Sequence, residues 1–151
     1  EDLSCTPKTR CSTCTELKTC FAIKDYVKYT VEDFGYVKGE KPIMGELFKR
    51  GPLSCSMYVS KNFIFNYTSG VFVECNISEN NHVVSIIGWG EDIDDNGHPR
   101  PYWIIRNSWG TNWGDGGFFR LPRSSYRGME CTSGIEIDCV YPLIGEIYTK
   151  R

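Results

Sequence analysis

Two stretches of this sequence dominate its interpretation: residues 81–90 read NHVVSIIGWG, and residues 102–114 read YWIIRNSWGTNWG. In the first stretch, a mostly apolar run begins at the second residue, His82. In the second stretch, an apolar run ends at Asn107. Short runs of this kind predict buried strands. An imidazole on one strand can then bond to a carboxamide beside the next, which fixes the tautomer of the ring. We therefore take His82 as a candidate base, Asn107 as the residue that orients it, and Trp109 as the indole that covers both.

The composition excludes several classes of protein. The chain has 151 residues, 40% hydrophobic and 14% aromatic, which suits a globular, loop-rich domain. A formal charge of −2 gives no long-range attraction to nucleic acid or to anionic membranes. No apolar run approaches the roughly 20 residues that span a bilayer. The first residues do not resemble a signal peptide, so we expect any targeting segment to lie outside this sequence.

The cysteines and the glycosylation sequons point to the secretory pathway. Eight cysteines in a chain of this length favour an oxidising compartment. Sequons begin at Asn66 (NYT) and Asn76 (NIS), and such acceptor sites function in secreted proteins. We therefore expect a lysosomal or extracellular location.

Residues 1–20 form a cysteine-rich segment with polar filling, which contains Cys5, Cys11, Cys14 and Cys20. A zinc site would need four well-placed ligands, and the segment has no histidine. A redox-active pair would need a strand–helix junction, but no apolar strand precedes the C-x-x-C spacing. We expect a disulfide-stapled surface segment, followed by a β-rich domain over residues 21–151.

The remaining pattern predicts an α+β fold that is mainly antiparallel β, barrel-like, with little helix. A helix is expected over residues 41–50, since Pro42 suits its first turn and Gly51-Pro52 ends it. Strands are expected at residues 21–37, 53–59, 70–73, 82–89, 102–106, 118–121 and around 135–137.

The acidic loop at residues 91–100 allows two interpretations. Asp92, Asp94 and Asn96 match the opening of a calcium-binding loop. Trp103 stands where the bidentate carboxylate of that loop is needed, and no helices flank the segment. A solvated hairpin with an Asn-Gly turn is the preferred interpretation.

The two stretches, in this order, resemble the histidine and asparagine segments of papain-like cysteine peptidases, and residues 116–121 (GGFFRL) continue the match. The resemblance implies the right-hand, β-rich domain of that fold. It also implies peptide hydrolysis through a thioester, without cofactor or metal. Expected partners are peptide or protein substrates and cystatin-like inhibitors.

Within the family, the cysteine-rich segment, residues 21–26 (FAIKDY), residues 51–55 (GPLSC), the sequon at Asn66 and Cys139 resemble the cathepsin X branch, also called cathepsin Z. That branch consists of lysosomal carboxypeptidases, so removal of C-terminal residues is the implied activity.

The nucleophile motif of the family, similar to Cys-Gly-Ser-Cys-Trp, does not occur in this sequence. We expect it in an N-terminal half that is missing here, so this chain alone should be inactive. Cys55 or Cys75 could replace the nucleophile, but disulfide pairing explains both more simply. The chain is then a fragment or one chain of a processed enzyme. The alternatives are a non-catalytic binding module on the same scaffold and a disulfide-rich adhesion domain with chance motifs.

The resemblance assigns roles to individual residues. His82 acts as general base and then general acid, and Asn107 accepts the imidazole N–H. Trp109 shields that hydrogen bond from water, and Asn81 tunes the thiolate–imidazolium pair.

In addition to Asn81 and Trp109, two further residues are expected to contact the substrate. Trp113 would line the leaving-group side of the cleft. Asp138 would lie near the floor of a side-chain pocket, where a carboxylate favours basic side chains. A solvated carboxylate is the other interpretation of Asp138.

The resemblance also suggests the disulfides Cys14–Cys20, Cys55–Cys139 and Cys75–Cys131, the last as in cathepsin L. The counterparts of Cys5 and Cys11 pair with the N-terminal half in cathepsin X. In this chain Cys5 and Cys11 would bond each other, bond a partner chain or stay free.

Overall fold

The computed structural model describes residues 4–10, 12–75 and 78–150, which form two compact units. The smaller unit lies within residues 1–33 and 144–151, and the larger unit comprises residues 34–143. None of the helices in the described ranges has the length and apolarity that a membrane crossing requires.

The smaller unit contains a short helix and a disulfide-linked hairpin. Helix α1 (Pro7–Arg10) precedes strands β1 (Ser12–Cys14) and β2 (Cys20–Ala22), which pair antiparallel. The Cys14–Cys20 disulfide closes this hairpin. The described residues contain no cluster of His, Cys, Asp or Glu that could hold a metal ion. Here a disulfide, rather than an apolar core, holds the chain together.

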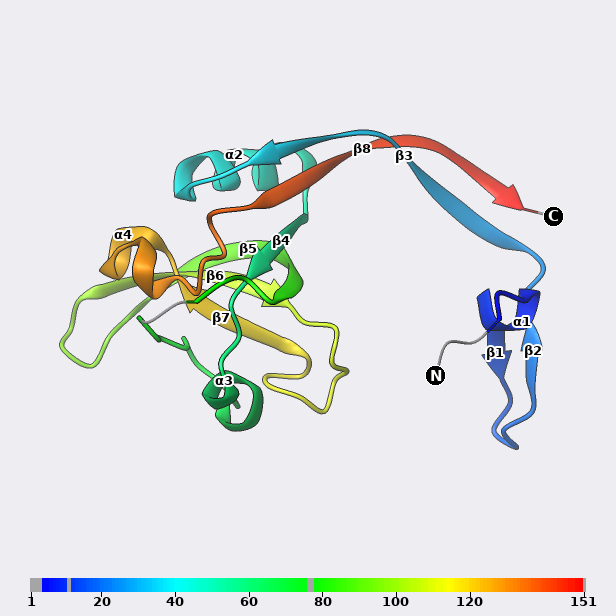
Figure 1. Ribbon diagram of the computed structural model, residues 1–151, viewed down its shortest axis with the longest axis horizontal. Helices are drawn as coiled ribbons and strands as arrows, with labels where there is room; N and C mark the ends of the chain where they lie inside the picture. The colour runs from blue at the N-terminus through cyan, green and yellow to red at the C-terminus, as the bar shows by residue number, and fades with distance from the viewer. Residues whose placement is uncertain (1–3, 11, 76–77, 151) are drawn as a thin grey trace. The chain divides into compact units, whose positions relative to one another are not determined.

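A six-stranded sheet with the order β3-β8-β4-β5-β6-β7 forms the framework (Figure 1). Its strands are β3 (Tyr26–Val37), β4 (Leu53–Met57), β5 (His82–Ile93), β6 (Pro99–Arg106), β7 (Phe118–Pro122) and β8 (Cys139–Lys150). The pairs from β4 to β7 are all antiparallel, which confirms the predicted fold class. The described strands form an open sheet rather than a closed barrel, because β3 and β7 end the order.

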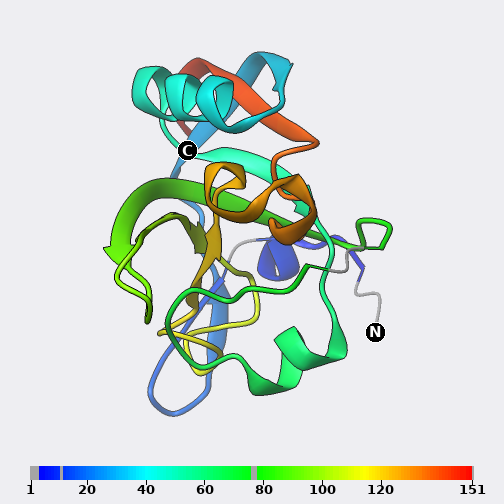
Figure 2. The same ribbon diagram turned by 90° about the vertical axis from the view of Figure 1, so that its left-hand side faces the viewer.

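Helices cover the strands of the larger unit. Helix α2 (Glu40–Arg50) and helix α3 (Lys61–Asn66) lie at opposite ends of this unit, with β4 to β7 between them (Figure 2). Helix α4 (Ser124–Arg127) and a 3-10 turn (Met129–Cys131) follow β7. The helix predicted at residues 41–50 is confirmed as α2, and the backbone N–H of Gly51 closes it on the carbonyl of Leu47.

Two predicted strands are absent from the structure, and two observed elements were not predicted. The segment around residues 135–137 forms turns, since the N–H groups of Ile135 and Ile137 bond carbonyls three residues earlier. Residues 70–73 contribute an isolated bridge at Val71 instead of a strand. Helix α3 and strand β8 were not anticipated. The Oγ of Ser60 starts α3 by accepting a hydrogen bond from the backbone N–H of Phe63 at 3.1 Å.

One apolar core joins the sheet to α2 and α3. It contains Ile43, Leu47, Leu53, Cys55, Met57, Phe63, Tyr67, Val84, Ile86, Trp103, Ile105, Phe119, Leu121, Ile135 and Cys139. On β4 the buried residues alternate with more exposed ones, as expected for a strand with one face on a core. The Cys55–Cys139 disulfide lies inside this core and links β4 to β8.

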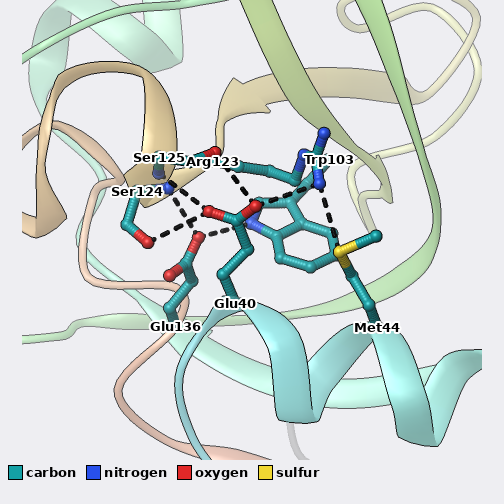
Figure 3. A network of polar contacts seen from close by, with 7 residues as sticks. All are labelled: Glu40, Met44, Trp103, Arg123, Ser124, Ser125 and Glu136. Atoms are coloured by element: carbon teal, nitrogen blue, oxygen red, sulfur yellow. Dashed lines mark hydrogen bonds and ion pairs between the residues drawn. The ribbon is translucent and has the colours of Figure 1, made fainter.

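A polar network fastens β6 to the helices (Figure 3). The Oε1 atom of the fully buried Glu136 accepts from the indole N–H of Trp103 on β6 and from the backbone N–H of Ser124, both at 2.9 Å. On α2, the carboxylate of Glu40 accepts from Arg123 at 3.0 Å and from the backbone N–H of Ser125 at 2.8 Å. Because buried carboxylates are costly unless bonded, these contacts fix how α2, α4 and β6 pack.

The acidic loop forms the β5–β6 hairpin, as predicted. Arg100 binds Asp92 through two nitrogens, at 2.8 and 3.0 Å. Asp94 accepts from the hydroxyl of Tyr126 at 2.7 Å and from two backbone N–H groups of the turn. Protein groups therefore occupy both carboxylates that a calcium-binding loop would use.

These bonds make the stability of the hairpin depend on pH. The hydroxyl of Tyr126, followed by the backbone N–H of His98, lowers the pKa of Asp94 from 3.8 to about 2. A carboxyl whose pKa is lowered by folding stabilises the protein above its ordinary pKa, and this contribution is lost as the pH falls towards the folded value.

We expect Tyr126→Phe to raise the pKa of Asp94 towards 3.8. The variant should be less stable than the wild type near neutral pH and should lose less stability between about pH 5 and pH 2. NMR titration of the Asp94 carboxyl and urea unfolding at both pH values test this, with the exposed Tyr36→Phe as control. An unchanged pKa in Tyr126→Phe would contradict the assignment.

Candidate active site

His82 and Asn107 meet where β5 begins and β6 ends. The Nε2 atom of His82 lies 2.9 Å from Oδ1 of Asn107. The same oxygen accepts the backbone N–H of Ser108 at 2.8 Å, and only an oxygen can accept both bonds. The proton of the neutral ring is therefore on Nε2. This arrangement leaves Nδ1 as the atom that can take up a proton.

The backbone around Asn107 depends on a glycine. The N–H of Asn107 donates to the carbonyl of Gly117 at 2.9 Å, which ties the end of β6 to the turn before β7. Gly117 has a φ of +92°, and a Cβ there would lie 3.1 Å from the carbonyl oxygen of Gly110. A side chain at this position would thus strain the turn that holds the carboxamide.

Trp109 covers the imidazole. The rings of His82 and Trp109 are 4.7 Å apart and inclined by 33°. Asn107 is only 8% exposed, so its bond to the ring is shielded from water. A hydrogen bond in a low-dielectric site is stronger than one in water.

Trp113 supports Trp109 from the side. Their rings meet edge to face at 4.8 Å, and the indole N–H of Trp113 donates to the carbonyl of Ile64 on α3 at 2.9 Å. Phe63 and Tyr67 complete this aromatic cluster, in which burial raises the pKa of Tyr67. Trp113 thus belongs to a packed aromatic cluster that contacts Trp109, the residue whose ring covers His82.

Asn81, immediately before the imidazole, bonds to a single peptide segment. Its Oδ1 accepts the N–H of Val59 at 2.9 Å, and its Nδ2 donates to the carbonyl of Val59 at 3.2 Å. Its own backbone N–H donates to the carbonyl of Met57 at 3.0 Å.

Asp138 is exposed and lies against β4. Its Oδ2 is 3.3 Å from the hydroxyl of Ser56, and Nδ2 of Asn80 donates to the same hydroxyl at 2.9 Å. Ser56 is adjacent to Met57, the residue that pairs with His82 across β4 and β5. Three polar side chains therefore lie together near the strand end that carries the imidazole. Sequence reasoning named only Asp138, because nothing local marks Ser56 and Asn80 as its neighbours.

The described disulfides are Cys14–Cys20, Cys55–Cys139 and Cys75–Cys131, the pairs that the resemblance suggests. Cys55 and Cys75 are both bonded, so neither is a thiol that could serve as nucleophile. Cys11 and Asn76 lie outside the described residues, so the three alternatives given above for Cys5 and Cys11 all stay open. Asn66 is exposed at the last residue of α3, and its Nδ2 donates to Asn62 at 2.9 Å.

An open hollow of about 650 Å³ lies beside Asn107. Ile87, Arg106 and Phe118, from three neighbouring strands, form part of its lining. Ile87 and Phe118 are each 38% exposed, and Val83 on β5 is 59% exposed. Apolar side chains thus lie open to solvent on the outward face of the sheet, next to the candidate site.

Comparison with known proteins gives one consistent family. The model of the papain family cysteine protease matches residues 4–143. Cathepsin Z of Onchocerca volvulus is 35% identical over 142 residues, which cover 93% of this chain and 45% of that protein. A cathepsin B-like cysteine proteinase of Caenorhabditis elegans is 39% identical over 75% of this chain and 33% of its own length.

Solved structures agree with the sequence matches. Bromelain from Ananas comosus, in complex with the E64 inhibitor, is 35% identical with a TM-score of 0.58. The match covers 72% of this chain and 49% of bromelain. Procathepsin L 3 of Tenebrio molitor is 27% identical with a TM-score of 0.60, over 75% of this chain and 35% of that one. This chain therefore spans less than half of each of these relatives.

The Trp113 contact predicts a measurable loss of stability. Trp113→Phe should lower the free energy of unfolding by about 1–2 kcal/mol, because the carbonyl of Ile64 loses its donor and the cluster loses volume. Chemical denaturation measures this change. Trp89→Phe is the control, since it makes the same side-chain change at another partly buried core position. If both variants lose the same free energy of unfolding, the hydrogen bond from Trp113 to Ile64 contributes nothing to stability.

Proposed function

Because this chain belongs to the papain family of cysteine proteases, we propose that it supplies the histidine and asparagine of a peptidase active site. The cysteine nucleophile comes from an N-terminal half that this sequence does not contain. The bond between His82 and Asn107 carries the proposal, since it leaves Nδ1 available and aims the ring.

In this mechanism His82 transfers protons at Nδ1. The ring takes the proton of the cysteine thiol, and the thiolate attacks the carbonyl carbon of the scissile peptide. The imidazolium then gives its proton to the leaving amine, which leaves a thioester on the cysteine. The ring next takes a proton from water, whose oxygen attacks the thioester and releases the acid product and the thiolate. The imidazolium then returns its proton to the sulfur, which restores the thiol and the neutral ring. Throughout, Asn107 accepts from Nε2 and stabilises both states of the ring.

The outward face beside Asn107 is the proposed seat of the nucleophile-bearing half. Its exposed apolar residues, Val83, Ile87 and Phe118, would be covered by such a partner. The Nδ2 atom of Asn107 is buried and has no acceptor among the described residues, and Asn107 lines the hollow on that face.

We propose carboxypeptidase action in the secretory pathway. The identity to a cathepsin Z over 93% of this chain supports the branch. The three described disulfides favour an oxidising compartment, and the exposed Asn66 sequon is an accessible acceptor for a glycan.

Asp138, with Ser56 and Asn80, is the proposed pocket for a basic substrate side chain. Its carboxylate is exposed and lies close to the strand that presents His82. An exposed anion at a side-chain pocket attracts a cation, whereas an apolar side chain would have to desolvate it.

The proposal predicts covalent labelling by an epoxide that alkylates active-site cysteines. The native protein should be labelled on a species heavier than this chain, or disulfide-linked to it, as judged by intact mass. His82→Ala should lower kcat/KM for a peptide substrate by roughly 10²- to 10⁴-fold, whereas Asn96→Ala in the hairpin should not. Absence of labelling on every species would reject the peptidase and favour a binding module on this scaffold.

A second experiment addresses specificity. Asp138→Asn should lower kcat/KM for a substrate with arginine in the pocket by about tenfold, relative to one with leucine, which corresponds to about 1.4 kcal/mol. Both substrates are measured on the wild type and the variant. An unchanged ratio would make Asp138 a solvated carboxylate without a role in selection.

A further inference from the structure

We infer that Asn81 is a positioning residue that ties the backbone of His82 to the helix supporting its aromatic cover. This inference rests on the proposed function of His82 as the base. It differs from the expected role of tuning an ion pair, because the side-chain amide of Asn81 bonds to the backbone N–H and the backbone carbonyl of Val59.

The side chain of Asn81 imitates a paired strand residue. It accepts the N–H of Val59 and donates to the carbonyl of Val59, while the backbone N–H of Asn81 reaches Met57. Regular pairing of β4 with β5 ends at the pair Met57 and His82. The amide therefore adds two hydrogen bonds to Val59, which lies two residues past the end of β4, where the ladder has stopped.

The clamped segment leads directly into α3. Val59 precedes Ser60, whose hydroxyl caps the helix by accepting from the N–H of Phe63. The next residue, Ile64, offers its carbonyl to the indole N–H of Trp113. The position of Trp113 is thus coupled to the segment that Asn81 holds.

The contacts then return to the imidazole. Trp113 packs edge to face on Trp109, and Trp109 covers the ring of His82. Asn81, Val59, α3, Trp113, Trp109 and His82 form a closed series of contacts. The backbone under the imidazole and the indole above it therefore have one common support, and the amide of Asn81 completes it.

An amide suits this position better than a carboxylate or an alanine. An aspartate would keep the bond from the N–H of Val59 but would oppose an anionic oxygen to the carbonyl of Val59. Alanine would lose both bonds. The structure therefore predicts the order wild type, Asn81→Asp, Asn81→Ala for the precision with which the ring is held.

The test measures kcat and KM in the active peptidase, with the nucleophile-bearing half present. Asn81→Ala should lower kcat about 10- to 100-fold, since small misplacement of a base is costly. KM should change less than about twofold, and the pH limbs of kcat/KM should not move. Asn81→Asp should give a kcat between those of Asn81→Ala and the wild type, and it replaces Asn81→Ala if that variant is unfolded at the assay temperature.

A double-mutant cycle tests the path through α3. If Asn81 and Trp113 act through one support, Asn81→Ala and Trp113→Phe together should reduce kcat by clearly less than the product of their separate effects. The control Asn96→Ala with Trp113→Phe should give the product. A multiplicative loss in the first pair overturns the inference.

Other outcomes separate the inference from the proposal beneath it. An unchanged kcat in Asn81→Ala, or a loss that appears only as a shifted pH limb, overturns the positioning role while the peptidase stands. A wild-type protein that neither cleaves peptides nor reacts with the epoxide overturns the proposed function itself.

Discussion

The pairing of β5 with β6 is the constraint on which the site depends. It joins the first residue of one strand, His82, to the residue after the other, Asn107, at 2.9 Å. The N–H of Ser108 fixes which atom of the carboxamide faces the ring. The tautomer of the imidazole thus follows from strand register and one backbone bond. The aromatic cluster adds shielding to an arrangement that the sheet already defines.

The polar network around Glu136 helps to hold β6 in its register with β5. Trp103 lies on β6, the strand that ends beside Asn107, and its indole N–H is fixed by a carboxylate with no exposure to solvent. The backbone carbonyl of Glu136 also accepts the N–H of Gly39, just before α2. Packing and polar contacts therefore agree on a single position for β6.

The elements that could be predicted from the sequence are those that a local residue pattern encodes. The apolar runs at residues 82–89 and 102–106 identified two adjacent strands, and Gly51 with Pro52 marked the end of α2. The Ile-Glu-Ile alternation at 135–137 suggested a strand, yet Glu136 is buried and Ile137 is exposed. A tertiary contact to Trp103 overrides that pattern.

What the sequence could not supply depends on distant partners. Strand β8 contains a proline and a glycine, so local signals obscured it, and its pairing with β3 and β4 defines it. Helix α3 has six residues, too few for a clear apolar period. The bonds of Asn81 to Val59 join residues separated by 22 positions, and no local pattern announces such a contact.

The segment between Cys131 and Cys139 is covalently anchored at both ends, by Cys75 and by Cys55. Its middle is fixed by Glu136. If one residue were added or deleted there, the two disulfides and the contacts of the Glu136 carboxylate could not all be kept. In this chain a change of length there would therefore require a moved cysteine or a replaced glutamate. The β5–β6 hairpin carries no covalent anchor in its described turn, so it can change length without such compensation.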